Sequence, residues 1–246
     1  MKVLITGAST GIGAAAAVAF GREGAKVAIH FNRSGKAAEQ VAEDVRKAGG
    51  EASLVQGDLC DRRRPKAVLD KAVELLGGLD VLVNNAGALV RRVPFQEIDE
   101  GLVDRVFDLN VRSVLTMTQA AIPHLEKEDC PAIINVGSIA GANGGGPGSA
   151  MYASSKAFIH NLTRHLAQDL AGKRIRVNAI APGVIATPFH AETPAERMEA
   201  MRRSVPLGRV GRPEECSGAI LFFASPHASG YITGQVLHIN GGQWMA

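Results

Sequence analysis

Short apolar runs rich in valine and isoleucine recur along the chain, and longer segments with helical spacing separate them. Most of the runs are nearly continuous rather than alternating, which is typical of strands buried on both faces of a parallel sheet. The predicted strands cover residues 3–5, 27–31, 52–55, 81–83, 132–136, 175–180 and 236–239. The predicted helices cover residues 13–23, 36–48, 66–75, 102–125 and 153–170.

The alternation of strands and helices continues along the whole chain without a linker or a break in composition. This order predicts an α/β fold, a single doubly wound domain of the Rossmann type over residues 1–246. Its parallel sheet is expected to have about seven strands and to carry helices on both faces. The glycine-rich segment 141–149 is too short to join two domains, so we expect a surface loop there.

The charge balance and the cysteines exclude several classes of function. Lys and Arg number 27 against 24 Asp and Glu, and a formal net charge of +3 is too small to indicate a nucleic-acid partner. The three cysteines are far apart and form no CxxC pair, so we expect neither a disulfide framework nor a metal site. No stretch is as long as a membrane span, and the first apolar run stops after Ile5. We therefore expect a cytoplasmic protein without a signal peptide or a membrane partner.

The first predicted strand runs into the sequence TGASTGIG, residues 6–13, and then into a helix. Gly7, Gly11 and Gly13 allow the backbone to turn sharply and to approach a pyrophosphate closely. The phosphate charge would then rest on the N–H groups and the positive dipole of the helix N-terminus. The spacing is GxxxGxG rather than the commoner GxGxxG, and a glycine-rich turn without a ligand is the alternative interpretation. Its position between the first strand and the first helix favours dinucleotide binding.

The segment MYASSKAF, residues 151–158, contains Tyr152 four residues before Lys156. Residues four apart share one face of a helix, and such a pair is usually structural. The alternative is a phenol whose proton exchange is tuned by the neighbouring ammonium. The pair alone does not decide between these two interpretations.

Five short motifs occur in order along the chain. They are TGxxxGxG in the first turn, NNAG at 84–87, NVGSIAG around Ser138, YASSK with Tyr152 and Lys156, and NAIAPG at 178–183. Each motif is weak alone, whereas five in this order are highly specific. Together they resemble the short-chain dehydrogenase/reductase family over essentially the whole chain. Within that family the chain is similar to 3-oxoacyl-carrier-protein reductases and to sugar-acid dehydrogenases.

The resemblance implies an enzyme that moves hydride between a nicotinamide and a carbonyl carbon, while Tyr152 gives a proton to the oxygen or takes it back. A free phenol has a pKa near ~10, and a nearby cation lowers it. Lys156 is placed to do so and is also implied to bond the nicotinamide ribose. Ser138 is implied to hydrogen-bond the substrate oxygen. Asn110 matches a fourth catalytic residue that holds a water next to the lysine; a polar residue on a solvent-facing helix is the alternative.

The same resemblance assigns the contacts of the cofactor. The glycine turn is implied to bind the pyrophosphate, and the NNAG segment that begins at Asn84 is implied to pass beneath the adenine ribose. Asp58 is similar to an acid that contacts adenine, although a simple loop cap explains it equally well. Thr187 matches a position that contacts the carboxamide. The implied cofactor-binding residues are Gly7, Ser9, Thr10, Gly11, Ile12, Gly13, Asn32, Arg33, Ser34, Asp58, Leu59, Asn85, Ala86, Gly87, Tyr152, Lys156, Pro182, Gly183 and Thr187.

The end of the second predicted strand reads HFNRSG and favours NADP(H) over NAD(H). Enzymes that prefer NAD usually carry an Asp or Glu there, and Phe31 occupies the corresponding position. Asn32, Arg33 and Ser34 supply hydrogen-bond donors instead, and an arginine suits a 2′-phosphate in geometry and in charge. The alternative interpretation of Arg33 is an ordinary solvated loop cation.

Two segments are candidates for contact with the substrate. Residues 188–206 are predicted to form a variable lid, whose mixed charges name no ligand. Arg91 and Arg92 follow NNAG closely and resemble a segment of sugar-acid dehydrogenases, so they are candidates for gripping a carboxylate. The alternative is that they point into solvent or pair with Glu97. We expect a small polar carbonyl or hydroxyl compound as the substrate.

Other functions stay open. An NAD-dependent sugar or sugar-acid dehydrogenase is one, and a 3-oxoacyl-carrier-protein reductase is another, although EKEDCP at 126–131 is acidic where such enzymes tend to be basic. Enoyl reductases of the superfamily space Tyr and Lys further apart, and a nucleotide-sensing scaffold would be expected to lose Tyr, Lys or Ser. The family resemblance, the apolar helices at 102–125 and 153–170 and the C-terminal QVLHINGGQWMA predict a homotetramer.

Overall fold

The strands form one parallel sheet in the computed structural model, which describes residues 1–245. The strand order is β3-β2-β1-β4-β5-β6-β7, and each neighbouring pair is parallel. The predicted doubly wound α/β fold is therefore confirmed. The strands are β1 (Lys2–Ile5), β2 (Lys26–Phe31), β3 (Glu51–Gln56), β4 (Val81–Asn84), β5 (Ala132–Val136), β6 (Arg176–Pro182) and β7 (Val236–Ile239).

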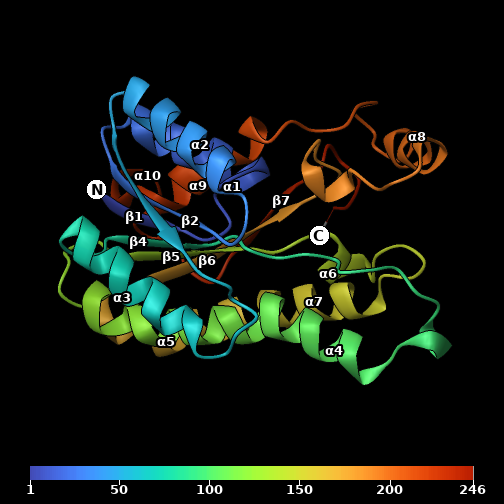
Figure 1. Ribbon diagram of the computed structural model, residues 1–246, viewed down its shortest axis with the longest axis horizontal. Helices are drawn as coiled ribbons and strands as arrows, with labels where there is room; N and C mark the ends of the chain where they lie inside the picture. Colours follow the sequence, from blue (N-terminus) through green and yellow to red (C-terminus); the bar gives the residue numbers. More distant parts are fainter. Residues whose placement is uncertain (246) are drawn as a thin grey trace.

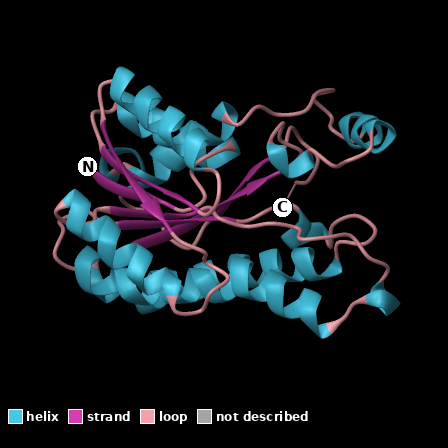
Figure 2. Cartoon of the chain, in the orientation of Figure 1, coloured by secondary structure: helices cyan, strands magenta, loops and turns pink. Residues whose placement is uncertain are grey.

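Helices cover both faces of this sheet in two layers, as Figures 1 and 2 show. One layer consists of α1 (Gly11–Arg22), α2 (Gly35–Lys47) and α9 (Glu214–Ala224), and the other of α3 (Arg64–Leu76), α5 (Ser113–Leu125) and α7 (Ala150–Asp169). Alternate side chains of a strand point to opposite faces. Val3 and Ile5 of β1 consequently enter the core under α1, α2 and α9, whereas Leu4 enters the core on the other face. Among the described residues no helix is long and apolar enough to cross a membrane.

The predicted helix over 102–125 is present and runs without a break from Glu100 to Leu125, but it is not α-helical throughout. The structure has α4 (Glu100–Phe107), a π-helical turn η2 (Asp108–Arg112) and then α5. A π turn adds a residue to one helical turn and occurs frequently at functional sites. This one carries Asn110, which is 1% exposed. The side chain of Asn110 therefore faces the interior of the protein and not the solvent.

The structure adds several elements that the sequence pattern did not predict. Of these, α9 belongs to the core, whereas α8 (Ala195–Arg203) has no buried residue and lies away from the sheet in Figure 1. The segment 188–206, predicted to be a lid, contains η4 and α8. The short elements are α6 (Ala140–Asn143), α8 (Ala195–Arg203), α10 (Pro226–Ser229) and the 3-10 turns η1 (Phe95–Glu97), η3 (Ala171–Lys173) and η4 (Pro188–His190).

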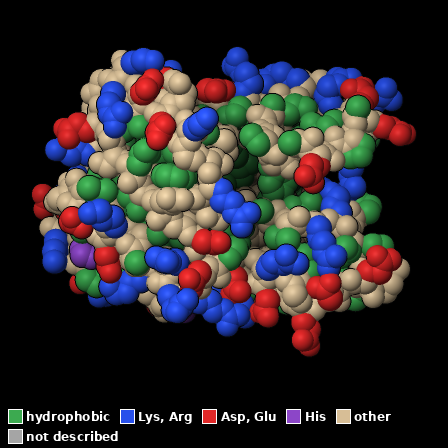
Figure 3. All heavy atoms as spheres, in the orientation of Figure 1, with side chains coloured by type: hydrophobic (Ala, Val, Ile, Leu, Met, Phe, Trp, Pro, Cys, Tyr) green, Lys and Arg blue, Asp and Glu red, His purple; other side chains and the backbone are tan. Residues whose placement is uncertain are grey.

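The strand order reverses between β1 and β4, and in doubly wound sheets such a point opens a crevice at the carboxyl ends of the strands. The turn after β1 uses the left-handed backbone region at Gly7 (φ 62°) and Gly11 (φ 61°). Asn85, which follows β4, ties this turn down, because its Nδ2 donates hydrogen bonds of 2.8 Å and 3.0 Å to the carbonyl oxygens of Thr6 and Gly7. Figure 3 shows the molecule hollowed near its centre, with hydrophobic side chains inside the hollow.

Candidate active site

A cavity of about 820 Å³ lies at the carboxyl ends of the strands and extends from the glycine turn to the segment 188–206. Most of the predicted site residues line it. They are Gly7, Ser9, Thr10, Gly11, Ile12, Asn32, Arg33, Ser34, Asp58, Leu59, Asn85, Ala86, Gly87, Arg92, Ser138, Tyr152, Lys156, Pro182, Gly183 and Thr187. The predicted residues Gly13, Arg91 and Asn110 are not part of this lining.

The glycine turn has the shape that a bound pyrophosphate requires. Helix α1 begins at Gly11, its N-cap Thr10 makes no side-chain cap hydrogen bond, and its first turn carries no acidic residue. A Cβ atom at Gly7 would lie 3.0 Å from Cα of Ala86, and one at Gly11 would lie 3.2 Å from Cγ2 of Thr187. The absence of these side chains lets a ligand approach the backbone N–H groups at the positive end of the helix. The residues present therefore fit a dinucleotide.

Gly13 packs the helix against the turn and does not face the cavity. A Cβ atom there would lie 2.5 Å from Nδ2 of Asn85 and 2.7 Å from the carbonyl oxygen of Gly7. These are two atoms of the contact that ties the turn to β4. Asn84, one residue earlier, is buried behind the cavity, where its amide donates a 2.9 Å hydrogen bond to Asn135.

His30, which no sequence motif singled out, connects the glycine turn with the end of β3. Its Nδ1 accepts a 3.0 Å hydrogen bond from the backbone N–H of Gly7, and its Nε2 lies 3.0 Å from the carbonyl oxygen of Gly57. These partners require a neutral imidazole with the proton on Nε2. Burial, the largest cause, lowers the pKa of this histidine. A histidine within the apolar run VAIHF was the available signal.

The end of β2 presents polar and cationic groups to the cavity but no carboxylate. Asn32, Arg33 and Ser34 are exposed and line the cavity, while Phe31 is buried. Asp58 is the single acid among the described lining residues. Its Oδ1 accepts a 2.9 Å hydrogen bond from the backbone N–H two residues later. Asp58 is therefore a loop cap that also borders the cavity.

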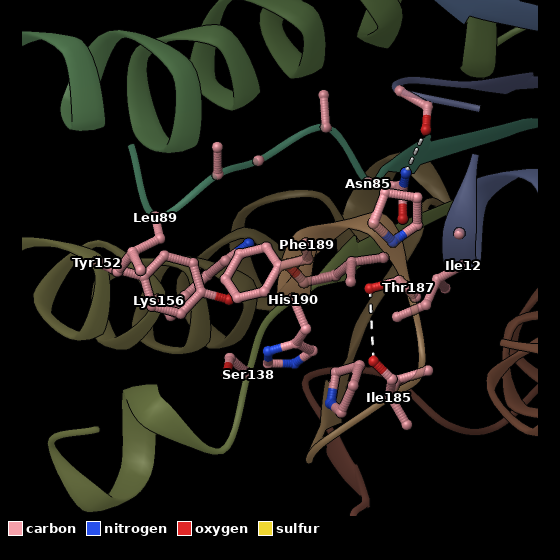
Figure 4. Close-up of a pocket in the computed structure, with 18 of the residues that line it drawn as sticks. Ile12, Asn85, Leu89, Ser138, Tyr152, Lys156, Ile185, Thr187, Phe189 and His190 are labelled. Atoms are coloured by element: carbon pink, nitrogen blue, oxygen red, sulfur yellow. Dashed lines mark hydrogen bonds between the residues drawn. The ribbon is translucent and has the colours of Figure 1, made fainter. Parts of the chain in front are cut away.

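Helix α7 brings Tyr152 and Lys156 to the cavity one turn apart, as Figure 4 shows. Lys156 is 5% exposed, and its Nζ donates a 2.7 Å hydrogen bond to the carbonyl oxygen of Val136. Burial lowers the pKa of its ammonium to about 8, because surroundings of low dielectric constant penalise the charged form. The structure therefore brings the predicted lysine and tyrosine together and holds the lysine against the end of β5.

The expected lowering of the Tyr152 pKa by Lys156 is not what the structure shows. Burial raises the pKa of the phenol, while the hydroxyl of Ser138 and the guanidinium of Arg92 act in the opposite direction. Nζ of Lys156 lies 5.8 Å from the centre of the tyrosine ring. The loss of water around the phenol consequently outweighs the hydroxyl of Ser138 and the charge of Arg92.

Ser138 follows β5 and lies in the same wall of the cavity. Its Oγ accepts a 3.1 Å hydrogen bond from the backbone N–H of Ala140, and its own backbone N–H lies 3.4 Å from Nε2 of His160 on α7. Burial is the largest cause that lowers the pKa of His160 to about 4, so the imidazole is neutral and can accept this bond. His160, which no sequence motif singled out, thus supports the backbone of the serine.

Asn110 connects the loop after β4 to α7 from behind the cavity. Its Nδ2 donates hydrogen bonds of 2.9 Å to the carbonyl oxygen of Ala88 and 3.0 Å to Oγ of Ser155. Its Oδ1 accepts a 2.9 Å hydrogen bond from the backbone N–H of Ala88. A Cβ atom on Gly87 would lie 3.1 Å from that oxygen and 3.2 Å from Nζ of Lys156, so the asparagine lies beside the lysine.

The far end of the cavity is formed by aromatic and basic side chains. The ring of Phe189 packs against Tyr152 with their centroids 5.4 Å apart, and His190 packs edge-on against Phe189 at 5.1 Å (Figure 4). Arg92 lines this end, whereas Arg91 is exposed and pairs with Asp99. Of the two candidate arginines, only Arg92 lines the same cavity as Tyr152.

A turn shaped for pyrophosphate and a Ser–Tyr–Lys set share one cavity, and this combination defines an oxidoreductase that depends on a dinucleotide. A family model described as enoyl-(acyl carrier protein) reductase matches residues 7–243. The chain belongs to the short-chain dehydrogenase/reductase family, as the motifs predicted.

Two relatives match nearly the whole chain. The 3-oxoacyl-(acyl-carrier-protein) reductase FabG of Thermotoga maritima is 40% identical over 239 residues, which cover 97% of this chain and 96% of its own. The cis-4-hydroxycyclohexanecarboxylate dehydrogenase of Sinomonas cyclohexanicum is also 40% identical, over 97% of this chain and 94% of its own.

Solved structures show the same fold. An NADH-dependent reductase A1-R′ responsible for alginate metabolism is 39% identical, with a TM-score of 0.92 over 99% of this chain and 97% of its own. A short-chain dehydrogenase from Burkholderia cenocepacia J2315 in complex with NADP is 32% identical, with a TM-score of 0.92 over 98% of this chain and 97% of its own. The chain is therefore an NAD(P)-dependent oxidoreductase of this family.

Proposed function

We propose that the protein interconverts a carbonyl compound and a secondary alcohol, with Tyr152 as proton donor and acceptor. A bound nicotinamide cofactor supplies or accepts the hydride. In the direction of reduction, Oγ of Ser138 donates a hydrogen bond to the carbonyl oxygen and holds it near the phenol. The oxygen takes the phenolic proton as the carbon is reduced, and the ammonium of Lys156 stabilises the phenolate that remains. The observation that carries this proposal is the presence of all three side chains on one cavity.

Asn110 and the segment 188–206 have supporting roles in this proposal. Asn110 lies beside Lys156 and holds the loop after β4, which supports its role next to the lysine, where a water would connect Nζ to solvent. Phe189, in the segment 188–206, packs on Tyr152. This contact supports a lid that covers the phenol and limits its access to water.

NADP(H) is the proposed preferred cofactor. Arg33 is exposed, borders the cavity at the end of β2 and forms no ion pair within the described residues, so its guanidinium can bind a 2′-phosphate. The lining residues at the end of β2 include no carboxylate that would bond the ribose hydroxyls of NAD(H). The two related structures are described as NADH-dependent and as bound to NADP, so the argument for this chain rests on its own residues.

A small polar compound is the proposed substrate, in preference to a carrier-protein thioester. In the acidic segment 126–131, Glu128 pairs with Lys2 and Glu126 pairs with Lys173, so this surface offers no cluster of unpaired cations to an acidic carrier protein. The relative from Sinomonas is named for a ring compound that bears a hydroxyl and a carboxylate. The relative from Thermotoga favours 3-oxoacyl thioesters as the second candidate.

A panel of carbonyl compounds tests this function, with the oxidation of NADPH and of NADH followed by absorbance. Small ketones, keto-sugar acids and 3-oxoacyl thioesters form its three arms. We expect turnover with NADPH and the highest kcat/KM with a small polar compound. The highest kcat/KM with a thioester would replace the proposed substrate class, and the absence of turnover with every compound would remove the proposed reaction.

A further inference from the structure

Two arginines from separate segments meet at the far end of the cavity. Arg92 comes from the loop after β4, and Arg197 comes from α8 in the segment 188–206. Nη1 of Arg92 and Nη2 of Arg197 each lie 3.1 Å from the carbonyl oxygen of Pro147. The two nitrogens are therefore no further apart than twice that distance. Two like charges are held together at one edge of the catalytic cavity.

Neither guanidinium is neutralised by the protein. Among the described residues, neither Arg92 nor Arg197 forms an ion pair with a carboxylate. The single acid of the described lining, Asp58, belongs to the loop after β3, at the dinucleotide end of the cavity. Burial and the charge of Arg197 both lower the pKa of Arg92. A pair of half-buried cations that repel each other and share one neutral acceptor is a site for an anion.

The neighbouring arginines behave differently, which sets this pair apart from ordinary surface charge. On α8, both Arg202 and Arg203 pair with Glu199. In the loop after β4, Arg91 pairs with Asp99. Each segment thus holds its other arginines against its own carboxylates and presents one arginine to the cavity. This arrangement is not expected of a randomly charged solvated face.

The groups around the pair fix its position and add a further polar atom to the cavity. The loop that contains Pro147 is fixed to the segment of Arg92, because the backbone N–H of Val93 donates a 3.2 Å hydrogen bond to Gly148. His190 also lines the cavity, and its buried Nδ1 has no hydrogen-bond partner in the described structure. Arg92 is close enough to Tyr152 to influence the pKa of the phenol. The anion site and the reacting atom are therefore close enough to be spanned by one small molecule.

We infer that Arg92 and Arg197 together bind a carboxylate of the substrate, so that the enzyme acts on small keto acids and hydroxy acids. A carboxylate has two oxygens in one plane, and each can accept hydrogen bonds from one guanidinium fork. The carboxylate would replace the carbonyl of Pro147 as the shared acceptor and would neutralise the repulsion. Because Arg197 belongs to α8, the bound carboxylate would also help to hold the segment 188–206 over the phenol, where Phe189 packs. This inference rests on the proposed function and adds its substrate class.

The test compares two substrates that carry the same ketone, one with a charged carboxylate and one with an uncharged ester. 4-Oxocyclohexanecarboxylate and its methyl ester carry the same ketone, and kcat/KM is measured for both with wild type, Arg92→Ala, Arg197→Ala and Arg92→Lys. For wild type, kcat/KM should be roughly tenfold or more higher with the acid than with the ester. In each alanine variant, kcat/KM with the acid should fall roughly ten- to hundredfold, as expected for lost charged hydrogen bonds, and kcat/KM with the ester should change little. Arg92→Lys should recover part of this loss. Arg91→Ala and Arg202→Ala, which remove arginines paired outside the cavity, should leave both values near those of wild type.

Several outcomes would overturn the inference. If the alanine variants lose kcat/KM equally with the acid and the ester, the two arginines have a structural role. If wild type has the same kcat/KM with both substrates, the enzyme does not recognise the carboxylate. A phosphorylated ketone preferred over the keto acid, with the same sensitivity to Arg92→Ala, would assign the site to phosphate. Calorimetric titration with cis-4-hydroxycyclohexanecarboxylate needs no turnover and separates this inference from the proposed reaction. Binding that is lost in Arg92→Ala supports the carboxylate site even if the reaction is different, and no binding to wild type contradicts it.

Discussion

Nζ of Lys156 lies 5.8 Å from the centre of the Tyr152 ring, one helical turn away on α7, and donates its hydrogen bond to the carbonyl of Val136. The ammonium therefore lies beside the phenol without bonding it. Burial raises the pKa of the phenol and lowers the pKa of the ammonium. Burial consequently favours the uncharged form of both groups. Negative charge that develops on the phenol during turnover would be stabilised by the lysine next to it.

The buried ammonium should lower the stability of the folded protein at neutral pH. The pKa of Lys156 falls from 10.5 to about 8 on folding, so the folded state binds fewer protons between these values and its stability rises with pH in that window. Below a pH of about 8 both states are charged and the penalty is complete. The difference in unfolding free energy between wild type and Lys156→Met should change by roughly 3 kcal/mol in favour of wild type as the pH rises through the window.

Urea unfolding of the cofactor-free protein across that pH range measures this difference. Lys127→Met, which removes an exposed lysine, should show no such dependence on pH. A stability difference between wild type and Lys156→Met that stays constant with pH would contradict the lowered pKa of the lysine.

Replacement of Arg33 by alanine should separate the two cofactors. The variant loses a charge-assisted contact to the 2′-phosphate, so its KM for NADPH should rise roughly ten- to hundredfold, while its KM for NADH stays nearly unchanged. Lys36→Ala removes an exposed cation next to the site that does not line the cavity and serves as the control. Equal increases of both KM values would remove the argument for NADP(H).

His30 should act on cofactor binding and not on the chemical step. His30→Leu leaves the backbone N–H of Gly7 without its partner, so the Kd of NADPH should rise roughly tenfold, with little change of kcat at saturating cofactor. In wild type the pKa of His30 lies below its usual value of 6.5, so the imidazole is neutral at neutral pH. Its hydrogen bond from Gly7 is lost only when the pH falls through this lowered pKa and the imidazole is protonated. Affinity should therefore weaken at acidic pH in wild type and less so in His30→Leu. A loss of kcat with unchanged Kd would contradict this role.

We expect a homotetramer in solution. Phe158 on α7 and Leu237, Trp244 and Met245 near the C-terminus are exposed apolar side chains, which suit an interface between copies of the chain. Light scattering at micromolar concentration should give four times the chain mass, and Phe158→Glu should reduce it. Phe95→Glu changes an equally apolar side chain in the η1 turn and should leave the mass unchanged. A monomer in wild type would contradict this expectation.

The sequence predicted the strands to within two residues, because parallel strands buried on both faces leave nearly continuous apolar runs. The π turn at Asp108–Arg112 was not predicted, because one extra residue leaves an apolar pattern that is compatible with a single α-helix on both sides of it. Helix α9 was not predicted, because its sequence EECSGAILFFA is apolar on several faces and shows no clear amphipathic pattern.

Ser138, Tyr152, Lys156 and the glycine turn could be singled out as lining one site because each belongs to a motif that is local in sequence. Arg197 could not, since an arginine on an exposed, mixed-charge helix gives no signal until the fold brings it to Pro147. The same holds for the choice between Arg91 and Arg92, which depends on where Asp99 lies. The hydrogen bond between His160 and the backbone of Ser138 could not be predicted either, because it depends on how α7 packs beside β5.

The most direct measurement of the central claim is the rate of NADPH oxidation by Tyr152→Phe on the substrate with the highest kcat/KM. The phenylalanine ring packs alike but has no proton to give, so turnover should fall by a factor on the order of a hundred to ten thousand while the Kd of NADPH stays the same. Tyr231→Phe, at the other, fully exposed tyrosine, should keep wild-type activity. A Tyr152→Phe variant that retains more than a few per cent of wild-type turnover would contradict the assignment of the proton donor.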